Sequence, residues 1–185
     1  MVNLVTGASG FIGGHLARTL AERGEPVRIL ARRSSDLRHL DGLAVEVAYG
    51  DLGDADSIRR AVDGCRVIFH CAGAATDWAS WQTFHTANVV GVQHMVDAAA
   101  HVSTLERFVH ISTSDVYGFP VPACDETHPL TDVGLPYNRS KIMGERVVWQ
   151  AAQAGLPVTV IRPACIYGPR SKDFVAQILS LIHIS

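Results

Sequence analysis

Short apolar segments alternate with longer segments of helical periodicity along this 185-residue chain, and this alternation constrains the fold most. The expected strands cover residues 2–6, 26–31, 44–49, 66–71, 106–112 and 157–162, and the expected helices cover about 11–23, 54–63, 80–101 and 136–154. Several strand segments are apolar almost throughout, which is typical of strands that helices cover on both faces. Strands and helices that alternate form right-handed β-α-β units. The sequence therefore predicts an α/β fold with a doubly wound parallel sheet.

Composition and charge exclude several classes of protein. Hydrophobic residues make up 48% of the chain and the formal net charge is -2. This balance gives no electrostatic reason to expect nucleic acid or an anionic membrane as a partner, and no apolar run approaches the length of a membrane span. The four cysteines and nine histidines show no metal-ligand spacing, so we expect no metal site. Scattered cysteines favour reduced thiols in a cytoplasmic protein.

A glycine-rich turn joins the first expected strand to the first expected helix. Gly7 permits a tight turn, Gly10 lets a pyrophosphate approach the backbone, and Gly13 lets the helix pack close to the strand. Free N–H groups at the start of the helix favour phosphate there, as in the dinucleotide-binding Rossmann fold. The alternative is a glycine-rich turn without a ligand. The predicted cofactor-binding turn comprises Gly7, Ser9, Gly10, Phe11, Ile12 and Gly13.

The residues after the second expected strand bear on which nicotinamide cofactor binds. An NAD site usually has an acidic residue here, which binds the ribose 2′-hydroxyl group. This chain has Arg32 and Arg33 instead, followed by two serines. Arginines suit a 2′-phosphate through charge-assisted hydrogen bonds, although a solvated pair of surface arginines is the alternative. We therefore expect NADP, while Asp36 keeps NAD possible.

Asp51 and Leu52 follow the third expected strand. The Asp51 carboxylate is well placed to accept a hydrogen bond from the adenine amino group. The alternative is that Asp51 caps the next helix, although Asp54 could do the capping instead.

Tyr137 and Lys141 are one helical turn apart, so they share one face of an expected helix. A phenol titrates near pH ~10 in water, which is too high for a base at neutral pH. A neighbouring ammonium group stabilises the phenolate and makes the tyrosine a usable general acid or base. The spacing Y-x-x-x-K occurs by chance in many helices. Its position after the fifth strand of a nucleotide-binding sheet is what makes it informative.

Five motifs occur in an order that resembles a known family. They are Gly7-x-x-Gly10-x-x-Gly13, Asn88-Val89-Val90-Gly91, Ser112-Thr113-Ser114-Asp115-Val116-Tyr117-Gly118, Tyr137-x-x-x-Lys141 and Arg162-Pro163-x-x-x-Tyr167-Gly168-Pro169. Together they resemble the extended short-chain dehydrogenases/reductases, the NAD-dependent epimerase/dehydratase superfamily with its dihydroflavonol-reductase and 3β-hydroxysteroid-dehydrogenase-like members. The resemblance covers residues 2 to about 170.

The resemblance implies roles for the remaining catalytic residues. Thr113 would hydrogen-bond the reacting oxygen, with Ser112 and Ser114 as runners-up. Asn88 would hold a structural water or support the proton relay. The implied catalytic set is therefore Thr113, Tyr137, Lys141 and Asn88.

The resemblance also implies further contacts with the cofactor. Tyr137 and Lys141 would lie beside it, Lys141 binding the nicotinamide ribose, and Pro163 would border the nicotinamide ring. The end of the fourth strand departs slightly from the usual H-x-A-A pattern, and its small last residue keeps access open. The implied cofactor-binding residues are Arg32, Arg33, Asp51, Leu52, Cys71, Ala72, Gly73, Tyr137, Lys141 and Pro163, in addition to the glycine turn.

The implied reaction is hydride transfer between the nicotinamide C4 atom and a ketone or secondary alcohol, a small-molecule substrate. One alternative is a nucleotide-sugar epimerase or dehydratase that holds NAD tightly. The two arginines disfavour it, and Asp115 offers one carboxylate where a dehydratase carries an acid pair. An alternative from another class is a non-catalytic NADP-binding sensor or scaffold.

The resemblance finally bears on the organisation of the chain. Residues 1–170 are expected to form the NAD(P)-binding domain, and residues 171–185 a truncated tail that resembles the translation of a sequencing adapter. A C-terminal substrate-binding lobe is then missing, and the chain would hold the cofactor without completing a substrate pocket. Family members often dimerise through the helices at about 80–101 and 136–154, which makes a homodimer a candidate assembly.

Overall fold

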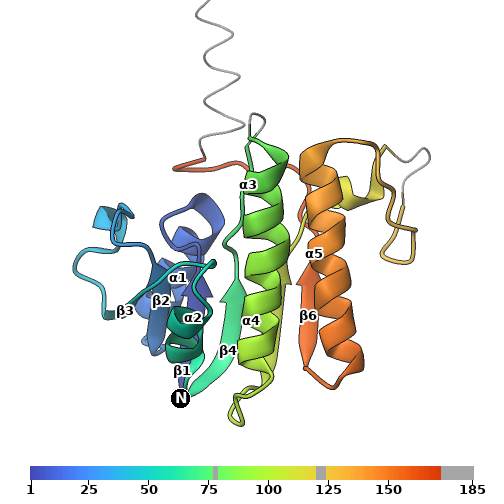
Figure 1. The fold of residues 1–185 in the computed structure, drawn as a ribbon. Helices are drawn as coiled ribbons and strands as arrows, with labels where there is room; N and C mark the ends of the chain where they lie inside the picture. Colours follow the sequence, from blue (N-terminus) through green and yellow to red (C-terminus); the bar gives the residue numbers. More distant parts are fainter. Residues whose placement is uncertain (77–78, 120–123, 172–185) are drawn as a thin grey trace, which may run out of the picture.

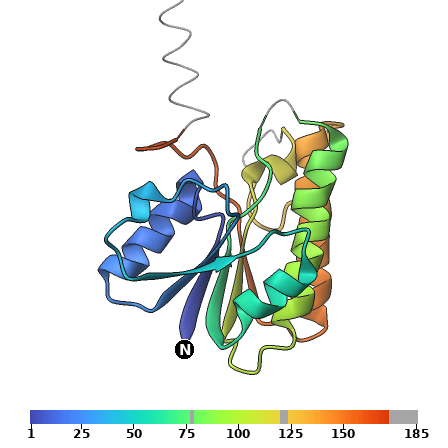
Figure 2. The same cartoon turned by 60° about the vertical axis from the view of Figure 1, so that its left-hand side comes forward.

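The computed structural model describes residues 1–76, 79–119 and 124–171. A six-stranded sheet forms its centre, and helices lie on both faces of the sheet (Figure 1, Figure 2). The strands are β1 (Val2–Thr6), β2 (Val27–Ala31), β3 (Val45–Tyr49), β4 (Cys65–His70), β5 (Arg107–Ile111) and β6 (Val158–Ile161). They lie in the order β3-β2-β1-β4-β5-β6, and every neighbouring pair is parallel. This is the Rossmann arrangement, so the predicted fold class is confirmed.

The helices divide unequally between the two faces of the sheet. They are α1 (Phe11–Glu22), α2 (Ala55–Val62), α3 (Trp81–His85), α4 (Gly91–Ala99) and α5 (Pro136–Gln153), with short helical turns η1 (Arg38–Leu40) and η3 (Ser114–Tyr117). A π-helical turn, η2 (Thr86–Val90), joins α3 and α4 into one continuous helical run. Figure 2 shows α1 on one face of the sheet, with α4 and α5 on the other. The single helix expected at 80–101 therefore contains a π turn that periodicity does not reveal.

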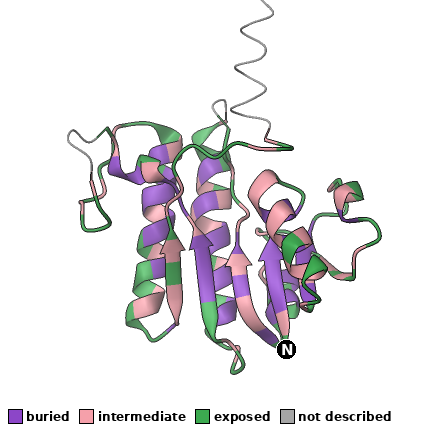
Figure 3. Ribbon diagram, turned by 180° about the vertical axis from the view of Figure 1, so that it is seen from behind, coloured by how far each residue is buried: buried purple, intermediate pink, exposed green. Residues whose placement is uncertain are grey.

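The core forms two layers, one on each face of the sheet. Successive residues of a strand point to opposite faces. Leu4 accordingly packs in a cluster with Ile68 and Phe108 beneath α4 and α5, whereas Val5 packs in a second cluster with Ile29. Figure 3 shows the buried residues concentrated in the central strands and on the helix faces that turn toward them.

Helix α5 carries the Tyr137–Lys141 pair, and its position is set by proline and glycine. Its first residue is Pro136. Proline lacks an N–H group, but the first N–H groups of a helix have no partner within the helix, so no hydrogen bond is lost. A Cβ atom on Gly144 would meet the backbone oxygen of Asn88, so only glycine lets the helices approach so closely. Helix α5 therefore packs directly on the π-helical turn η2.

The C-terminal tail and the membrane are the subjects of two further expectations. Residues 172–185, nearly all of the expected tail, lie outside the described residues, so the boundary at residue 170 stays a prediction. Among the helices that are described, none has the length and apolar character needed to cross a membrane.

Candidate dinucleotide and catalytic site

A cleft with a volume of about 640 Å³ opens at the carboxyl edge of the sheet. It lies where the strand order reverses between β1 and β4, the point at which open α/β sheets bind ligands. Nine predicted cofactor-binding residues line it: Gly7, Ser9, Gly10, Arg32, Asp51, Leu52, Cys71, Ala72 and Gly73. They follow four different strands, so the fold brings together residues that are far apart in the sequence.

The glycine turn has the geometry that phosphate binding requires. Gly7 has a φ of 71°, and a Cβ atom there would lie 2.8 Å from the backbone of Ala72. Gly13 packs against the turn, because its Cβ would lie 2.5 Å from the Gly7 carbonyl oxygen. The N-cap residue of α1 is Gly10, which has no side chain to bond the first N–H groups of the helix. The first N–H groups of α1 thus remain suited to an anion, which fits a dinucleotide pyrophosphate.

The two arginines after β2 diverge. Arg32 lines the cleft together with Ser35. The guanidinium of Arg33 lies instead over the ring of Tyr49, 4.9 Å from the ring centre. Arg32 is therefore better placed than Arg33 to meet a group in the cleft.

Asp36, the acidic residue that kept NAD possible, is engaged elsewhere. Its carboxylate pairs with the Arg38 guanidinium at 2.7 Å on the surface. The hydrogen bonds from Arg38 hold the pKa of Asp36 below its usual range. This carboxylate does not line the cleft.

The structure separates the roles of two aspartates after β3. Asp54 is the N-cap of α2, because its side chain accepts hydrogen bonds from the backbone N–H groups of Asp56 (3.0 Å) and Ser57 (3.2 Å). Asp51 lines the cleft and accepts a hydrogen bond from the Gly53 N–H at 2.8 Å. Asp54, and not Asp51, therefore does the capping.

Lys141 reaches the carboxyl end of β5. Its Nζ atom donates a hydrogen bond to the Ile111 carbonyl oxygen at 2.8 Å, and the residue is only 7% exposed. Burial lowers the pKa of Lys141 to about 8, and the charge of Glu145 opposes this shift. The amine is thus held at the sheet edge, and burial shifts its pKa downward from the ordinary lysine value.

Tyr137 lies in the first turn of α5, where its ring packs 5.9 Å from that of Phe84 in α3. The next residue, Asn138, fixes this turn: its amide nitrogen donates to the carbonyl oxygens of Asp115 (2.6 Å) and Thr131 (3.2 Å). Asn138 therefore ties the helix that carries the tyrosine to the segment after β5. It stands inside the Y-x-x-x-K motif, but sequence reasoning gave it no role because its burial cannot be read from the motif.

Thr113 and its neighbours follow β5. The Thr113 hydroxyl oxygen accepts a hydrogen bond from the Asp115 N–H at 3.2 Å, which leaves its own hydrogen for another acceptor. The Ser114 N–H donates to the Pro163 carbonyl oxygen at 2.9 Å and so holds the segment after β6 against this turn. The Ser112 hydroxyl is buried and has no hydrogen-bond partner among the described residues.

Asn88 lies in the π-helical turn η2 and bonds two other segments of the chain. Its amide nitrogen donates to the Ala74 carbonyl oxygen and to the Ser140 hydroxyl, both at 2.9 Å. Its amide oxygen accepts from the Ala74 N–H at 2.8 Å, and a Cβ atom on Gly73 would lie 2.8 Å from that oxygen. Asn88 thus joins the loop after β4 to α5. The water-holding role implied for it stays a prediction.

A buried ion pair beneath the site was not predicted. Glu145 is fully buried one turn after Lys141 and pairs with Arg162, the shortest N–O distance being 2.7 Å. Arg162 also donates to the Tyr117 hydroxyl at 2.7 Å, and the pairing with Glu145 raises the pKa of the guanidinium. The pair connects α5, η3 and the residue after β6. Its sequence signal is the spacing 137, 141, 145, which places a third ionisable group on one helix face.

The cleft also differs in extent from the prediction. Its lining includes residues outside the predicted catalytic and cofactor-binding sets: Thr6, Leu30, Ala31, Ser35, Gly50, Gly53, Ala74, Ser80, Gln82, Thr83, Thr86 and Ala87. Those near the strand ends extend predicted segments, whereas the others lie at the start of the α3–η2 run. Predicted site residues outside the lining are Phe11, Ile12, Gly13, Arg33, Asn88, Thr113, Tyr137, Lys141 and Pro163.

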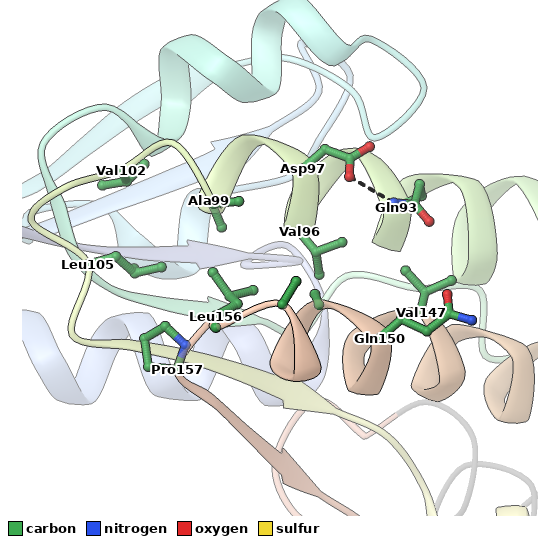
Figure 4. Close-up of a pocket in the computed structure, with 14 residues that line it drawn as sticks. Gln93, Val96, Asp97, Ala99, Val102, Leu105, Val147, Gln150, Leu156 and Pro157 are labelled. Carbon is green, nitrogen blue, oxygen red and sulfur yellow. Dashed lines mark hydrogen bonds between the residues drawn. The ribbon is translucent and has the colours of Figure 1, made fainter.

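A second hollow of about 490 Å³ lies between α4 and α5, near their connections to β5 and β6 (Figure 4). Most residues that line it are apolar, among them Val96, Leu105 and Leu156, and on its rim the Gln93 side chain donates to the Asp97 carboxylate at 2.7 Å. It contains none of the predicted site residues. Half of the predicted site residues line the cleft at the carboxyl edge instead.

Known proteins resemble this chain along nearly its whole length. Sterol demethylase protein B of Methylococcus capsulatus is 40% identical over 173 residues, which cover 91% of this chain and 52% of that protein. The 2-alkyl-3-oxoalkanoate reductase of Stenotrophomonas maltophilia is 34% identical over 180 residues, 95% of this chain and 54% of that protein. The structure of UDP-glucuronic acid 4-epimerase from Bacillus cereus in complex with NAD superimposes with a TM-score of 0.84 at 26% identity, covering 97% of this chain and 61% of that one.

The family assignment agrees with the fold and with the order of the motifs. The chain spans about half the length of the curated relatives it matches. Residues 3–183 match the NAD dependent epimerase/dehydratase family. The chain belongs to that family.

Proposed function

We propose that this chain is the cofactor-binding and proton-transferring part of an oxidoreductase that moves hydride between a nicotinamide cofactor and a ketone or secondary alcohol. The observation that carries the proposal is the buried amine of Lys141, fixed to the Ile111 carbonyl oxygen one helical turn from Tyr137. A cation in this position stabilises a phenolate. The cleft behind the glycine turn supports binding of a dinucleotide on the same edge of the sheet.

The chain's own residues would handle the proton. When bound, the nicotinamide supplies or accepts the hydride. During reduction Tyr137 gives its phenolic proton to the ketone oxygen, and the Thr113 hydroxyl donates a hydrogen bond to that oxygen as it gains negative charge. The Lys141 ammonium stabilises the tyrosinate that remains. In the direction of oxidation Tyr137 takes the proton back from the alcohol.

NADP is the cofactor that we propose. Arg32 lines the cleft, and in the described part of the chain no carboxylate pairs with it. The Asp36 carboxylate forms an ion pair with Arg38, which argues against a hydrogen bond from Asp36 to the ribose 2′-hydroxyl group of NAD. The alternative is that this chain binds NAD, and the related Bacillus cereus epimerase, whose structure contains NAD, supports it.

Calorimetric titration of this chain with NADPH and NADH tests the cofactor. We expect NADPH to bind more tightly, and Arg32→Ala to weaken NADPH roughly 10- to 100-fold while leaving NADH unchanged, since a charged hydrogen bond contributes about 1.5–3 kcal/mol. Arg33→Ala is the matched control, because its guanidinium lies over Tyr49. Equal or tighter binding of NADH to the wild-type chain would show the assignment of NADP to be wrong.

The nucleotide-sugar epimerase alternative has its own test. Such an enzyme regenerates its cofactor, so UDP-sugars would interconvert without net loss of cofactor absorbance at 340 nm. The reductase that we propose would oxidise NADPH in proportion to the ketone reduced. In a protein that joins this chain to a substrate-binding lobe, a cofactor that binds without either reaction would favour the non-catalytic sensor.

We also propose self-association through α4 and α5. The hollow between these helices and the 42% exposed Trp149 on α5 support such a contact. Sedimentation velocity should show a dimer that Trp149→Glu dissociates, and a monomer at all concentrations would refute it. The four cysteines are free, which supports the cytoplasmic location that we propose.

A further inference from the structure

Two histidines lie in the core beside the proposed catalytic lysine. His70 of β4 and His110 of β5 are register partners, with ring centres 5.5 Å apart and ring planes 26° from parallel. Their exposed fractions are 0% and 1%. The Lys141 amine bonds the carbonyl of Ile111, the residue that follows His110, and its charge acts on both rings. The stacked imidazoles therefore form part of the surroundings of the ammonium.

Thr6 orients one of the two rings. Its hydroxyl oxygen lies 2.9 Å from His70 Nδ1 and accepts a hydrogen bond from the Ala72 N–H at 3.1 Å. Because the Thr6 oxygen already accepts from Ala72, we infer that its hydroxyl hydrogen is donated to His70 Nδ1, which would place the imidazole hydrogen on Nε2. His70 thereby connects the last residue of β1, next to the glycine turn, with the interior below Lys141.

Four buried polar atoms in this region have no hydrogen-bond partner among the described residues. They are His70 Nε2, His110 Nδ1, His110 Nε2 and Ser112 Oγ. His110 and Ser112 are two residues apart at the end of β5, so they face the same side of the sheet. We call His70, His110 and Ser112 the polar cluster. It combines donors and acceptors, and buried water typically bonds about three such atoms that would otherwise be unsatisfied.

The polar cluster carries no charge near neutral pH. Burial lowers the pKa of His70 to about 3 and that of His110 well below its ordinary value, and the charge of Lys141 acts in the same direction. Unlike a carboxylate, a neutral imidazole can bond an ammonium or a water without adding charge. The cluster can thus solvate the lysine without neutralising it.

Other ionisable groups near Lys141 do not solvate its ammonium in place of the polar cluster. Burial raises the pKa of the Cys71 thiol on the β4 side to about 12, so it stays neutral. On α5 itself Tyr137 precedes Lys141 by one turn and Glu145 follows by one turn. The Glu145 carboxylate is already bonded by the Arg162 guanidinium.

We propose that the polar cluster holds an ordered water molecule against Lys141 and thereby positions the ammonium beside Tyr137. The histidines are positioning residues, since they act through the lysine. The role of Tyr137 in this statement rests on the proposed function, whereas the water site and its effect on Lys141 do not.

Nuclear magnetic resonance of the wild-type chain tests the water site directly. We expect His70 and His110 to stay neutral between pH 5 and 8, His70 with its hydrogen on Nε2. That hydrogen should show a cross-relaxation signal to a long-lived water. Titration of either ring near its ordinary value of ~6.5, or no contact with water, would overturn the proposal.

His110→Leu separates positioning from a purely structural role. A structural role predicts equal or higher stability, because an unpaired polar group is removed, with the pKa of Lys141 unchanged. The proposal predicts that loss of the solvating ring lowers the pKa of Lys141, followed by ¹³Cε resonances, by roughly 0.7 unit, which corresponds to about 1 kcal/mol. In His110→Asn the pKa of Lys141 should return most of the way to its wild-type value. His101→Leu, at an exposed position, is the control. An unchanged Lys141 pKa in His110→Leu would overturn the proposal.

Failure of this inference and failure of the proposed function give different results. A chain with the expected water contact and Lys141 shift that binds neither NADPH nor NADH contradicts the proposed function alone. A chain that binds NADPH but shows titrating histidines contradicts the polar cluster alone. If His110→Leu does not fold, the wild-type measurements still decide the matter.

Discussion

Loss of the Arg162 guanidinium should destabilise the protein strongly, because it leaves a buried carboxylate without a partner. Glu145 is 0% exposed, and the side chain of Arg162 is 13% exposed. Three N–O distances of 2.7, 2.9 and 3.2 Å join the two groups. Removing one partner of such a pair costs about 3–5 kcal/mol, well above the value of a surface pair.

Arg162→Met removes the charge and keeps much of the side-chain volume. For a chain of this size each kcal/mol lowers the melting temperature by about 2–4 °C, so the expected decrease is roughly 6–20 °C. Circular dichroism measures the melting temperature, and urea titration with an unchanged m-value confirms that stability alone has changed. Tyr117→Phe is the control, since it removes only the bond between Arg162 and the phenol, at a cost of about 1 kcal/mol.

The double variant Glu145→Leu/Arg162→Met decides whether the unpaired charge causes the loss. With both charges gone, an apolar pair of similar volume should recover most of the stability lost in the single variant. The reasoning is refuted if Arg162→Met costs less than about 1 kcal/mol, or if the double variant is no more stable than the single one.

Three other predictions follow from the geometry. Tyr137→Phe should bind NADPH as the wild type does, but the oxidoreductase that contains this chain should lose turnover of its ketone by a factor of roughly 10²–10⁴, and unchanged turnover would contradict the role of Tyr137. His70 should make the fold acid-sensitive: its folded-state pKa of about 3 lies below the ordinary 6.5, so the stability it contributes is complete above pH 6.5 and is lost as the pH falls toward 3, at up to about 1.4 kcal/mol per pH unit. Urea unfolding at several pH values should show a shallower loss in His70→Asn, and an identical slope would refute this. Gly13→Ala should cost about 1–3 kcal/mol in urea unfolding, because its Cβ would lie 2.5 Å from the Gly7 carbonyl oxygen; Gly53→Ala, which meets only a side chain, should cost less, and equal costs would contradict the packing argument.

The fold was predictable because its signals are local and repeated. All six expected strands occur, and each end lies within one residue of its expected position. Residues such as Pro26 and Gly155 beside the strands and helices set these boundaries. The π-helical turn was not predictable, since it adds one residue to a helical turn without a change in composition.

The candidate site was predictable only where strand ends define it. Segments that follow parallel strands must meet at one edge of the sheet, which is why Gly7, Arg32, Asp51 and Cys71 line one cleft. The direction of a side chain after a strand depends on the turn, so the divergence of Arg33 toward Tyr49 left no trace in the sequence.

Contacts between distant segments could not be predicted either, because the local sequence does not determine them. The stacking of His70 on His110 depends on the register of two strands separated by forty positions. The pairing of Glu145 with Arg162 depends on how α5 packs against β6. Such contacts follow from tertiary packing, which local periodicity does not encode.

Chemical-shift mapping of the isotope-labelled chain during titration with NADPH tests the central claim most directly, because it needs no substrate. The account predicts saturable shifts at the amides of Gly7, Gly10 and Gly73 and at the Lys141 side chain, with the Leu156 amide beside the α4–α5 hollow unchanged. Shifts confined to that hollow, or no saturable shift with either NADPH or NADH, would contradict the account.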